Sequence, residues 1–178
     1  SGLNVLQLLG HECVTPIPGL VPLSLSAPFL RQLDGVRIEA TVGVVDESST
    51  IRTERGEILF TAYGISGIPV MQISRTASEL LLKGRQPSID LNLLPTMSHE
   101  EISKRIALFP DRELDKSLVG FLHKKLIPVV IRCAGIEPIR EITGQLTHER
   151  IDRLAKLLMG WRIPISGVQP WARAQVMA

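Results

Sequence analysis

The stretch with the residue types best suited to chemistry runs from Gly56 to Val70 and reads G-E-I-L-F-T-A-Y-G-I-S-G-I-P-V. Its first part is apolar and β-prone and predicts a strand, while Gly64 and Gly67 bracket Ser66 and predict a tight turn. Pro69 suits the first turn of a helix, where its missing N–H is not needed. A strand that leads into a helix N-terminus presents unpaired N–H groups and a partial positive charge. Such a place can hold an anion or an electron-rich ring edge.

Ser66 has two interpretations. A serine between glycines suggests a nucleophile, but the glycine that a nucleophile elbow has two residues later is absent here. A helix cap is the interpretation that we favour, with the turn from Tyr63 to Gly67 left equally open to a functional and a purely structural role. No G-x-G-x-x-G and no P-loop occurs in the sequence, so a nucleotide would be held chiefly by something outside this chain.

The other polar groups predict no second site. The histidines and cysteines have no metal-ligand spacing, so we expect no metal and two free thiols. The acidic residues near 100 and from 111 to 115 suit helix starts better than acid–base catalysis. Lys124, Lys125 and Arg132 suit a solvated helix face, because no aromatic residues are interleaved with them. The histidines and cysteines are His11, His99, His123, His148, Cys13 and Cys133.

Composition predicts a folded protein without a strongly charged partner. The 178 residues are 44% hydrophobic and 21% charged, and 20 basic against 18 acidic residues give a formal net charge of +2. This charge is too small to argue for nucleic acid or an anionic membrane, and aromatics at 4% argue against base stacking. No apolar run approaches the roughly 20 residues that cross a bilayer, and no signal sequence is apparent. We therefore expect a cytoplasmic protein that contacts neither nucleic acid nor membrane.

Strands dominate the first part of the sequence. Val36–Val44 alternates apolar and polar residues and is the strongest strand candidate, and the polar run Asp46–Arg55 predicts a turn back into the Gly56 strand. Ser66 is expected to cap a helix that runs to Leu81 and is closed by Gly84. The remaining expected elements are a helix over Leu3–Leu9 ended by Gly10, extended runs over Glu12–Thr15 and Leu20–Leu25, and a strand over Ser88–Leu94.

Helices take over from residue 96. Ser98 and Glu101 form a capping box, and Thr147 is placed to cap the most amphipathic helix, which Gly160 ends. The residues between predict one or two further helices that end at Gly135, with Pro128 starting or kinking one of them. Trp161–Val168 and Trp171–Met177 return to extended character.

This order predicts an α+β fold with an antiparallel, barrel-like β-subdomain and an inserted helical lobe. Residues 1–95 and 160–178 would form the barrel-like subdomain, and residues 96–159 the lobe. We expect the last two extended runs to complete the sheet of the first part. Because the sequence starts without a methionine inside a helix-like pattern and stops inside a strand-like one, we also expect an excised domain.

The stretch from Gly56 to Pro69 resembles the G-E-x-L-F-T-H-x-G-[LI]-S-G-P-A signature of the BaiN/YhiN-type bacterial FAD-dependent oxidoreductases. Further similarities are the L-G-H run that ends at His11, the L-V-P-L run that starts at Leu20, Ile89-Asp90-Leu91 and Leu94-Pro95. The resemblance spans the chain. It implies an insert, made of a β-barrel and a helical lobe, between the halves of an FAD-binding domain.

Two positions depart from that signature. The usual histidine is Ala62 here, and the usual Pro-Ala pair is Ile68-Pro69. A histidine near a flavin could donate a proton, so its absence indicates either a different substrate or a position that is not catalytic in the family.

The resemblance implies that the whole protein binds FAD and performs redox chemistry on a small organic substrate. The partner of this chain would then be the FAD-binding domain of the same parent, and the chain alone would neither hold FAD nor turn over. The residues implied to face the flavin or substrate are Thr61, Tyr63, Gly64, Ser66 and Gly67. The alternative is a non-catalytic barrel-plus-helices module that recognises a protein partner through the lobe.

Overall fold

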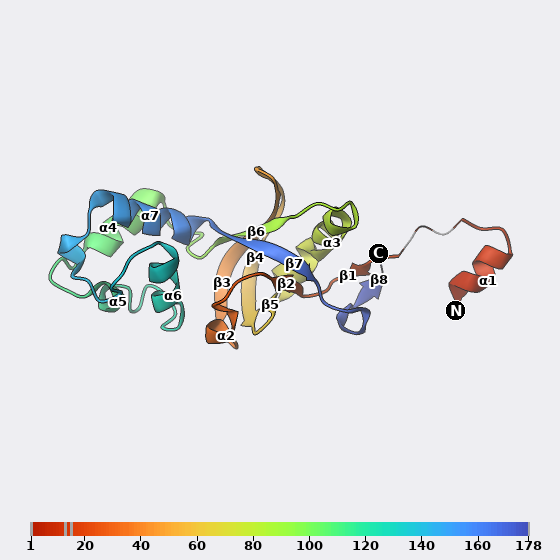
Figure 1. The fold of residues 1–178 in the computed structure, drawn as a ribbon, viewed down its shortest axis with the longest axis horizontal. Coiled ribbons are helices and arrows are strands. Elements are labelled where there is room, and N and C mark those ends of the chain that lie inside the picture. Colours follow the sequence, from red (N-terminus) through yellow and green to blue (C-terminus); the bar gives the residue numbers. More distant parts are fainter. Residues whose placement is uncertain (1, 13, 15, 178) are drawn as a thin grey trace.

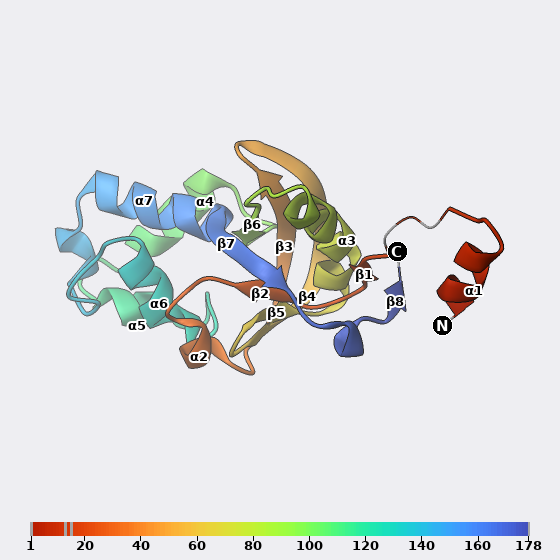
Figure 2. The ribbon, with the colours of Figure 1, turned by 45° about the vertical axis from the view of Figure 1, so that its right-hand side comes forward.

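The architecture is a closed six-stranded antiparallel barrel with helices at one end. The computed structural model describes residues 2–12, 14 and 16–177. The barrel strands neighbour one another in the order β2-β5-β4-β3-β6-β7, and Figures 1 and 2 show the helices α4 to α7 gathered beyond one end of them. This confirms the predicted α+β class. The strands are β2 (Leu23–Leu25), β3 (Arg37–Asp46), β4 (Ser49–Thr61), β5 (Gly64–Ser66), β6 (Ser88–Asn92) and β7 (Trp161–Val168).

The β3–β4 hairpin is the longest pairing in the barrel. Its register runs from Arg37 opposite Leu59 to Asp46 opposite Ser49. The predicted turn back into the Gly56 strand is therefore confirmed, but it is much shorter than the polar run Asp46–Arg55, since the connection contains only residues 47 and 48 and the rest belongs to β3 and β4. The first half of β4 is exposed on both faces, so it carries no apolar alternation that would mark it as a strand.

β5 closes the barrel and leads into helix α3 (Ile68–Leu82). It pairs with β4 on one side and with β2 on the other. Ser66 lies in β5 opposite Leu59, so its predicted role as helix cap is wrong. The N-cap is Gly67, with φ +114° and no side-chain cap, and Pro69 is in the first turn as predicted. Gly84 follows the helix with φ +71°, which confirms the predicted end.

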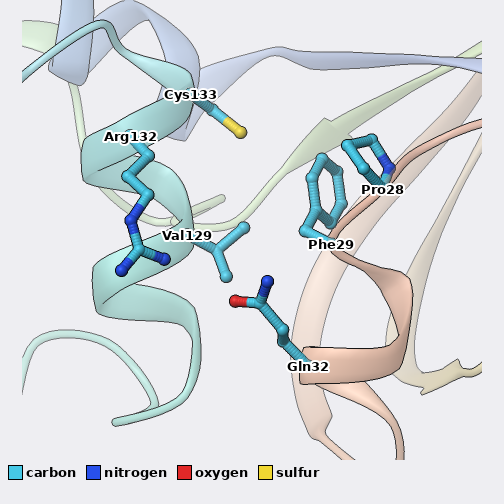
Figure 3. A pocket seen from close by; sticks show the side chains of 6 residues that line it. All are labelled: Pro28, Phe29, Gln32, Val129, Arg132 and Cys133. Carbon is cyan, nitrogen blue, oxygen red and sulfur yellow. The ribbon is translucent and has the colours of Figure 1, made fainter.

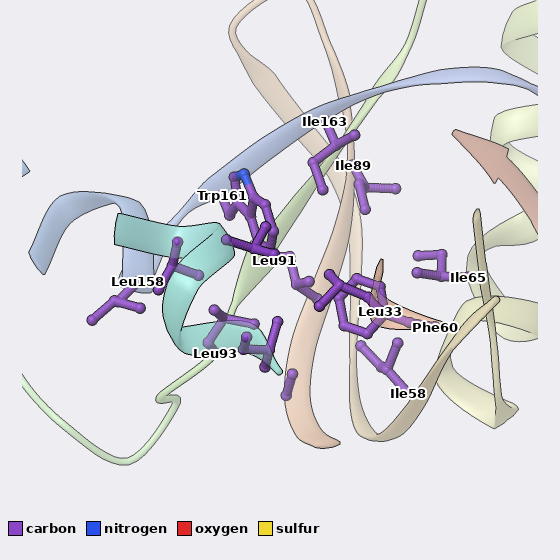
Figure 4. Close-up of a cluster of buried hydrophobic side chains, with 14 of the residues drawn as sticks. Leu33, Ile58, Phe60, Ile65, Ile89, Leu91, Leu93, Leu158, Trp161 and Ile163 are labelled. Atoms are coloured by element: carbon purple, nitrogen blue, oxygen red, sulfur yellow. The ribbon is translucent and has the colours of Figure 1, made fainter. Parts of the chain in front are cut away.

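Large apolar side chains fill the barrel. Phe60, Ile58 and Ile65 are fully buried, and Figure 4 shows them beside Leu33 and Ile89 inside the ring of strands. Towards the helices, Trp161 stacks on Phe29 with ring centroids 4.7 Å apart. One continuous core thus runs from the barrel into the helices.

Two of the helices between β6 and β7, α4 and α7, begin at the predicted caps. Ser98 Oγ accepts a hydrogen bond from the Glu101 N–H, and the Glu101 carboxylate accepts one from the Ser98 N–H at 2.8 Å, which confirms the capping box. Thr147 Oγ1 accepts from the Arg150 N–H, as predicted. The division into two domains at residues 96 and 159 stays a prediction. The elements are α4 (His99–Ala107), α5 (Leu114–Ser117), α6 (Leu126–Cys133), η1 (Thr143–Gln145) and α7 (His148–Met159).

The short strand after α1 pairs with the last strand of the chain rather than with the barrel. β1 (Pro18–Gly19) and β8 (Val176–Met177) form a separate two-stranded sheet. The expectation that both final runs complete the barrel is therefore right for β7 and wrong for β8. The reason is Pro170 and the 3₁₀ turn η2 (Trp171–Arg173), which redirect the chain after β7.

Three short elements remain near the start of the chain. α1 (Gly2–Leu8) agrees with the predicted first helix, and Gly10 follows it with φ +85°. The predicted run Leu20–Leu25 is a strand only over β2, and the run Glu12–Thr15 lies partly outside the described residues. The single turn α2 (Leu30–Leu33) was not predicted.

Candidate functional site

The β4–β5 turn uses its own polar groups to hold its shape. Thr61 Oγ1 accepts a hydrogen bond from the Gly64 N–H at 3.1 Å, and the Tyr63 carbonyl accepts one from the Leu25 N–H at 3.0 Å. The Arg173 guanidinium lies over the Tyr63 ring, 5.1 Å from its centroid. Since these groups already have partners, the turn is a rigid support and offers few free donors.

Gly64 and Gly67 are required by close packing. A Cβ on Gly64 would lie 2.1 Å from the carbonyl oxygen of Leu23, and a Cβ on Gly67 would lie 2.4 Å from that of Glu57. Gly67 also has a φ of +114°, a conformation that side chains rarely adopt. The two glycines therefore let β5 and the start of α3 lie against β2 and β4.

A cavity of about 410 Å³ opens at the N-terminus of α3. No side chain caps this helix, and the first N–H groups of a helix have no acceptor within it. Ile68, at the mouth of the cavity, is 75% exposed. The lining residues are Arg37, Arg55, Gly56, Glu57, Gly67, Ile68 and Pro69.

The positive character of this cavity comes mainly from the helix. Arg37 pairs with Glu57 at 2.6 Å, and Arg55 lies 3.8 Å from Glu39, all with exposed side chains. The two guanidinium groups are therefore matched by two carboxylates. The α3 N-terminus adds a partial positive charge that no described side chain caps. The arrangement suits an anion or the electron-rich edge of a ring.

The structure divides the five predicted site residues into two groups. Thr61, Tyr63 and Gly64 lie at the turn, whereas Ser66 and Gly67 lie at the other end of β5, where α3 begins. Only Gly67 lines the α3 cavity. Ala62, which takes the place of the family histidine, is exposed at the turn. A role of these residues in cofactor binding stays a prediction.

The sequence reasoning singled out the stretch that holds Glu57 but missed the two arginines of β3 and β4 that line the α3 cavity, Arg37 and Arg55. They reach it through the hairpin register. A signal was present, because Arg37 and Glu39 alternate along one strand, and Arg55 and Glu57 along the next, in opposite order along an antiparallel pair.

Polar side chains outside the α3 cavity form hydrogen bonds and ion pairs on the helices α4 and α7. Hydrogen bonds from the backbone and side chain of Ser98 hold the pKa of Glu101 below its ordinary value. The Asp152 carboxylate lies 2.7 Å from Lys156 Nζ and 3.0 Å from His99 Nε2, and the Lys156 contact lowers the pKa of Asp152. Within the described ranges, no three His, Cys, Asp or Glu side chains are grouped to hold a metal ion.

No helix in the part of the chain that the structure describes is long and apolar enough to cross a bilayer.

Comparison with known proteins gives a family. Residues 17–176 match the family described as "HI0933-like protein barrel and H2TH domain". The chain is 31% identical over 140 residues to the 3-dehydro-bile acid delta(4,6)-reductase of Clostridium scindens, which covers 76% of this chain and 34% of that protein. It is 27% identical to the ribosomal RNA dihydrouridine synthases of Haemophilus influenzae and Escherichia coli, over 98% of this chain and 41% and 42% of theirs. The chain thus spans less than half the length of these relatives.

Proposed function

The chain belongs to the family of HI0933-like barrel and H2TH proteins, and from this premise we propose that it is the substrate-side insert of an FAD-dependent oxidoreductase. One of its relatives is named a reductase, and the resemblance of Gly56–Pro69 to the flavoprotein signature agrees with a redox function. The observation that carries the proposal is the uncapped N-terminus of α3 at the C-terminal end of that stretch.

The residues at the α3 cavity fit one edge of a flavin. The first N–H groups of α3 present a partial positive charge to an electron-rich group, and exposed Ile68 provides an apolar surface for a ring. FAD, when bound, supplies hydride transfer. The sequence holds no phosphate-binding loop, so the phosphates would be held by other segments of the parent protein.

The chain's own contribution to the reaction is positioning and charge. The hydrogen bonds of Thr61 and Tyr63 and the close contact of Gly64 with Leu23 fix the β4–β5 turn. Strand β5 connects this fixed turn directly to the start of α3, and so helps to fix the position of the helix N-terminus. A preorganised positive end stabilises negative charge that develops next to it, without reorganisation during the reaction.

The first test is the absorbance of the purified full-length protein. We expect it to purify with a flavin spectrum, and the bound cofactor to be FAD when released and identified by mass. The present chain, expressed alone and shown to be folded by circular dichroism, is expected to be colourless. A full-length protein without flavin absorbance would contradict the proposal and favour the non-catalytic binding module.

A second candidate concerns the substrate. The relatives that cover 98% of this chain are named for ribosomal RNA, whereas the small net charge predicts no nucleic-acid partner. Lys124 has no carboxylate partner among the described residues, and the same holds for neighbouring Lys125. Retention of ribosomal RNA by the full-length protein on a filter, reduced by replacing both lysines with glutamine, would favour this substrate over a small molecule.

A further inference from the structure

A second cavity, separate from the α3 site, lies between α2 and α6. Its volume is about 230 Å³. This is smaller than pockets for drug-sized ligands, which begin at roughly 300 Å³. Figure 3 shows Val129 and Cys133 of α6 directed across the cavity towards Phe29, with the Gln32 amide below them. The six lining residues are Pro28, Phe29, Gln32, Val129, Arg132 and Cys133.

The walls of this cavity are apolar and held in place. Phe29 is fixed on its other side by stacking on Trp161, with centroids 4.7 Å apart and planes at 30°. Lys125 Nζ donates to the carbonyl of Asp34 at 3.2 Å and so ties the start of α6 to the segment after α2. A flat ring that enters between Phe29 and Val129 meets preformed surfaces, which lowers the entropic cost of binding.

Among the described residues that line the cavity, Arg132 carries the only charge. No carboxylate within the described ranges lies in ion-pair distance of its guanidinium. Burial raises the pKa of the Cys133 thiol, so the thiol stays neutral near pH 7 and does not compete for the guanidinium. Gln32 adds an amide that can donate or accept. The charge and the walls together favour an anionic ligand with an apolar body.

We propose that this cavity binds a small aromatic carboxylate, with its ring between Phe29 and Val129 and its carboxylate on the Arg132 guanidinium. An arginine fork matches a carboxylate in two parallel hydrogen bonds. The ligand would bridge α2 and α6, and its binding does not depend on the flavin proposed above.

Protection of Cys133 from alkylation tests this site in the full-length protein. Iodoacetamide is applied with increasing benzoate, and the modified Cys133 peptide is quantified by mass spectrometry. We expect benzoate to slow the alkylation of Cys133, and benzyl alcohol, which has the ring without the charge, to protect at least about tenfold more weakly. Free N-acetylcysteine in the same solutions corrects for effects on the reagent.

Two arginine variants separate the site from a general charge effect. Arg132→Gln is expected to raise the half-protecting benzoate concentration about tenfold. Arg153→Gln, at an exposed position of α7 outside the cavity, is expected to leave it unchanged. Three results would overturn the proposal: no protection by benzoate, equal protection by benzyl alcohol, or an unchanged half-protecting benzoate concentration in Arg132→Gln. The flavin spectrum is unaffected by any of these outcomes, so the two proposals fail separately.

Discussion

The end of the barrel at β4, β5 and α3 and the helical region from α4 to α7 are held together in different ways. At the barrel end, backbone lies against backbone, and Gly64 and Gly67 are needed because a Cβ would enter a neighbouring carbonyl. In the helical region, side chains satisfy the helix ends, as at Ser98 and Thr147, and Glu141 pairs with Arg150 through two contacts of 2.6 Å. The candidate site lies in the region with less tolerance for change.

This difference predicts which substitutions each region tolerates. Removing a cap leaves a helix that neighbouring turns and core contacts still support, so the cost is limited. Adding an atom between packed strands forces the backbone apart, so the cost is larger. The contrast can be tested by comparing stability losses in the two regions.

The largest effect is expected for Gly64→Ala. The new Cβ would lie 2.1 Å from the Leu23 carbonyl oxygen and 2.9 Å from the Leu25 nitrogen, so β5 must move away from β2. We expect a loss of about 3 kcal/mol or more in the free energy of unfolding, measured by urea denaturation. Gly84→Ala is the matched control, because it also replaces a glycine of positive φ but meets open space. It should cost about 1 kcal/mol. Equal losses would contradict the close-packing account.

An intermediate effect is expected at the helix caps. Thr147→Ala removes the hydrogen bond from the Arg150 N–H and should cost about 1 kcal/mol, as N-cap losses typically do. The same denaturation experiment measures it, with Ser49→Ala on the exposed start of β4 as a control of about zero. A loss as large as that of Gly64→Ala would remove the distinction between the two regions.

The smallest effect is a change in the pH dependence of stability at Glu101. Its folded pKa is lowered from 4.5 by the Ser98 hydrogen bonds. Its contribution is therefore complete above 4.5 and is lost as the pH falls through the lower folded pKa. Glu101→Gln should flatten the decline of stability with acid in this range, measured as the urea midpoint at a series of pH values.

Glu100→Gln is the control for this titration. Glu100 pairs only with exposed Lys104, one turn along α4, and takes no part in the capping box. The variant should keep the wild-type decline with acid. The same flattening in both variants would show that the capping box is not its source.

Much of the helical region could be predicted from sequence because its signals are local. Ser98 and Glu101, or Thr147 and the stripe that follows it, lie within a few residues of each other, and their roles are set by that spacing. Strand β3 could also be predicted, because apolar and polar residues alternate along it. The barrel end depends on pairings between distant residues, such as Leu23 with Ile65 and Ser24 with Gly167. No local pattern specifies these pairings.

The candidate site shows the same division. Its centre, from Gly56 to Pro69, was visible as an unusual stretch, and its helix start was predicted. Ser66 was predicted to cap this helix, but it lies in β5 opposite Leu59. Arg37 and Arg55 were missed, because only the hairpin register brings them to the α3 N-terminus.

The most direct test of the central claim, that the N-terminus of α3 faces the flavin, is the flavin midpoint potential of two full-length variants. Ile68→Asp and Leu82→Asp each place a carboxylate at an exposed position, at opposite ends of one 15-residue helix. The ends are about 20 Å apart, well beyond the Debye length of about 8 Å at physiological salt. A carboxylate at the N-terminus favours the helix and one at the C-terminus disfavours it, so lost folding cannot imitate the expected result. We predict a more negative potential for Ile68→Asp and an unchanged potential for Leu82→Asp. Unchanged potentials in both variants, or equal shifts, would contradict the claim.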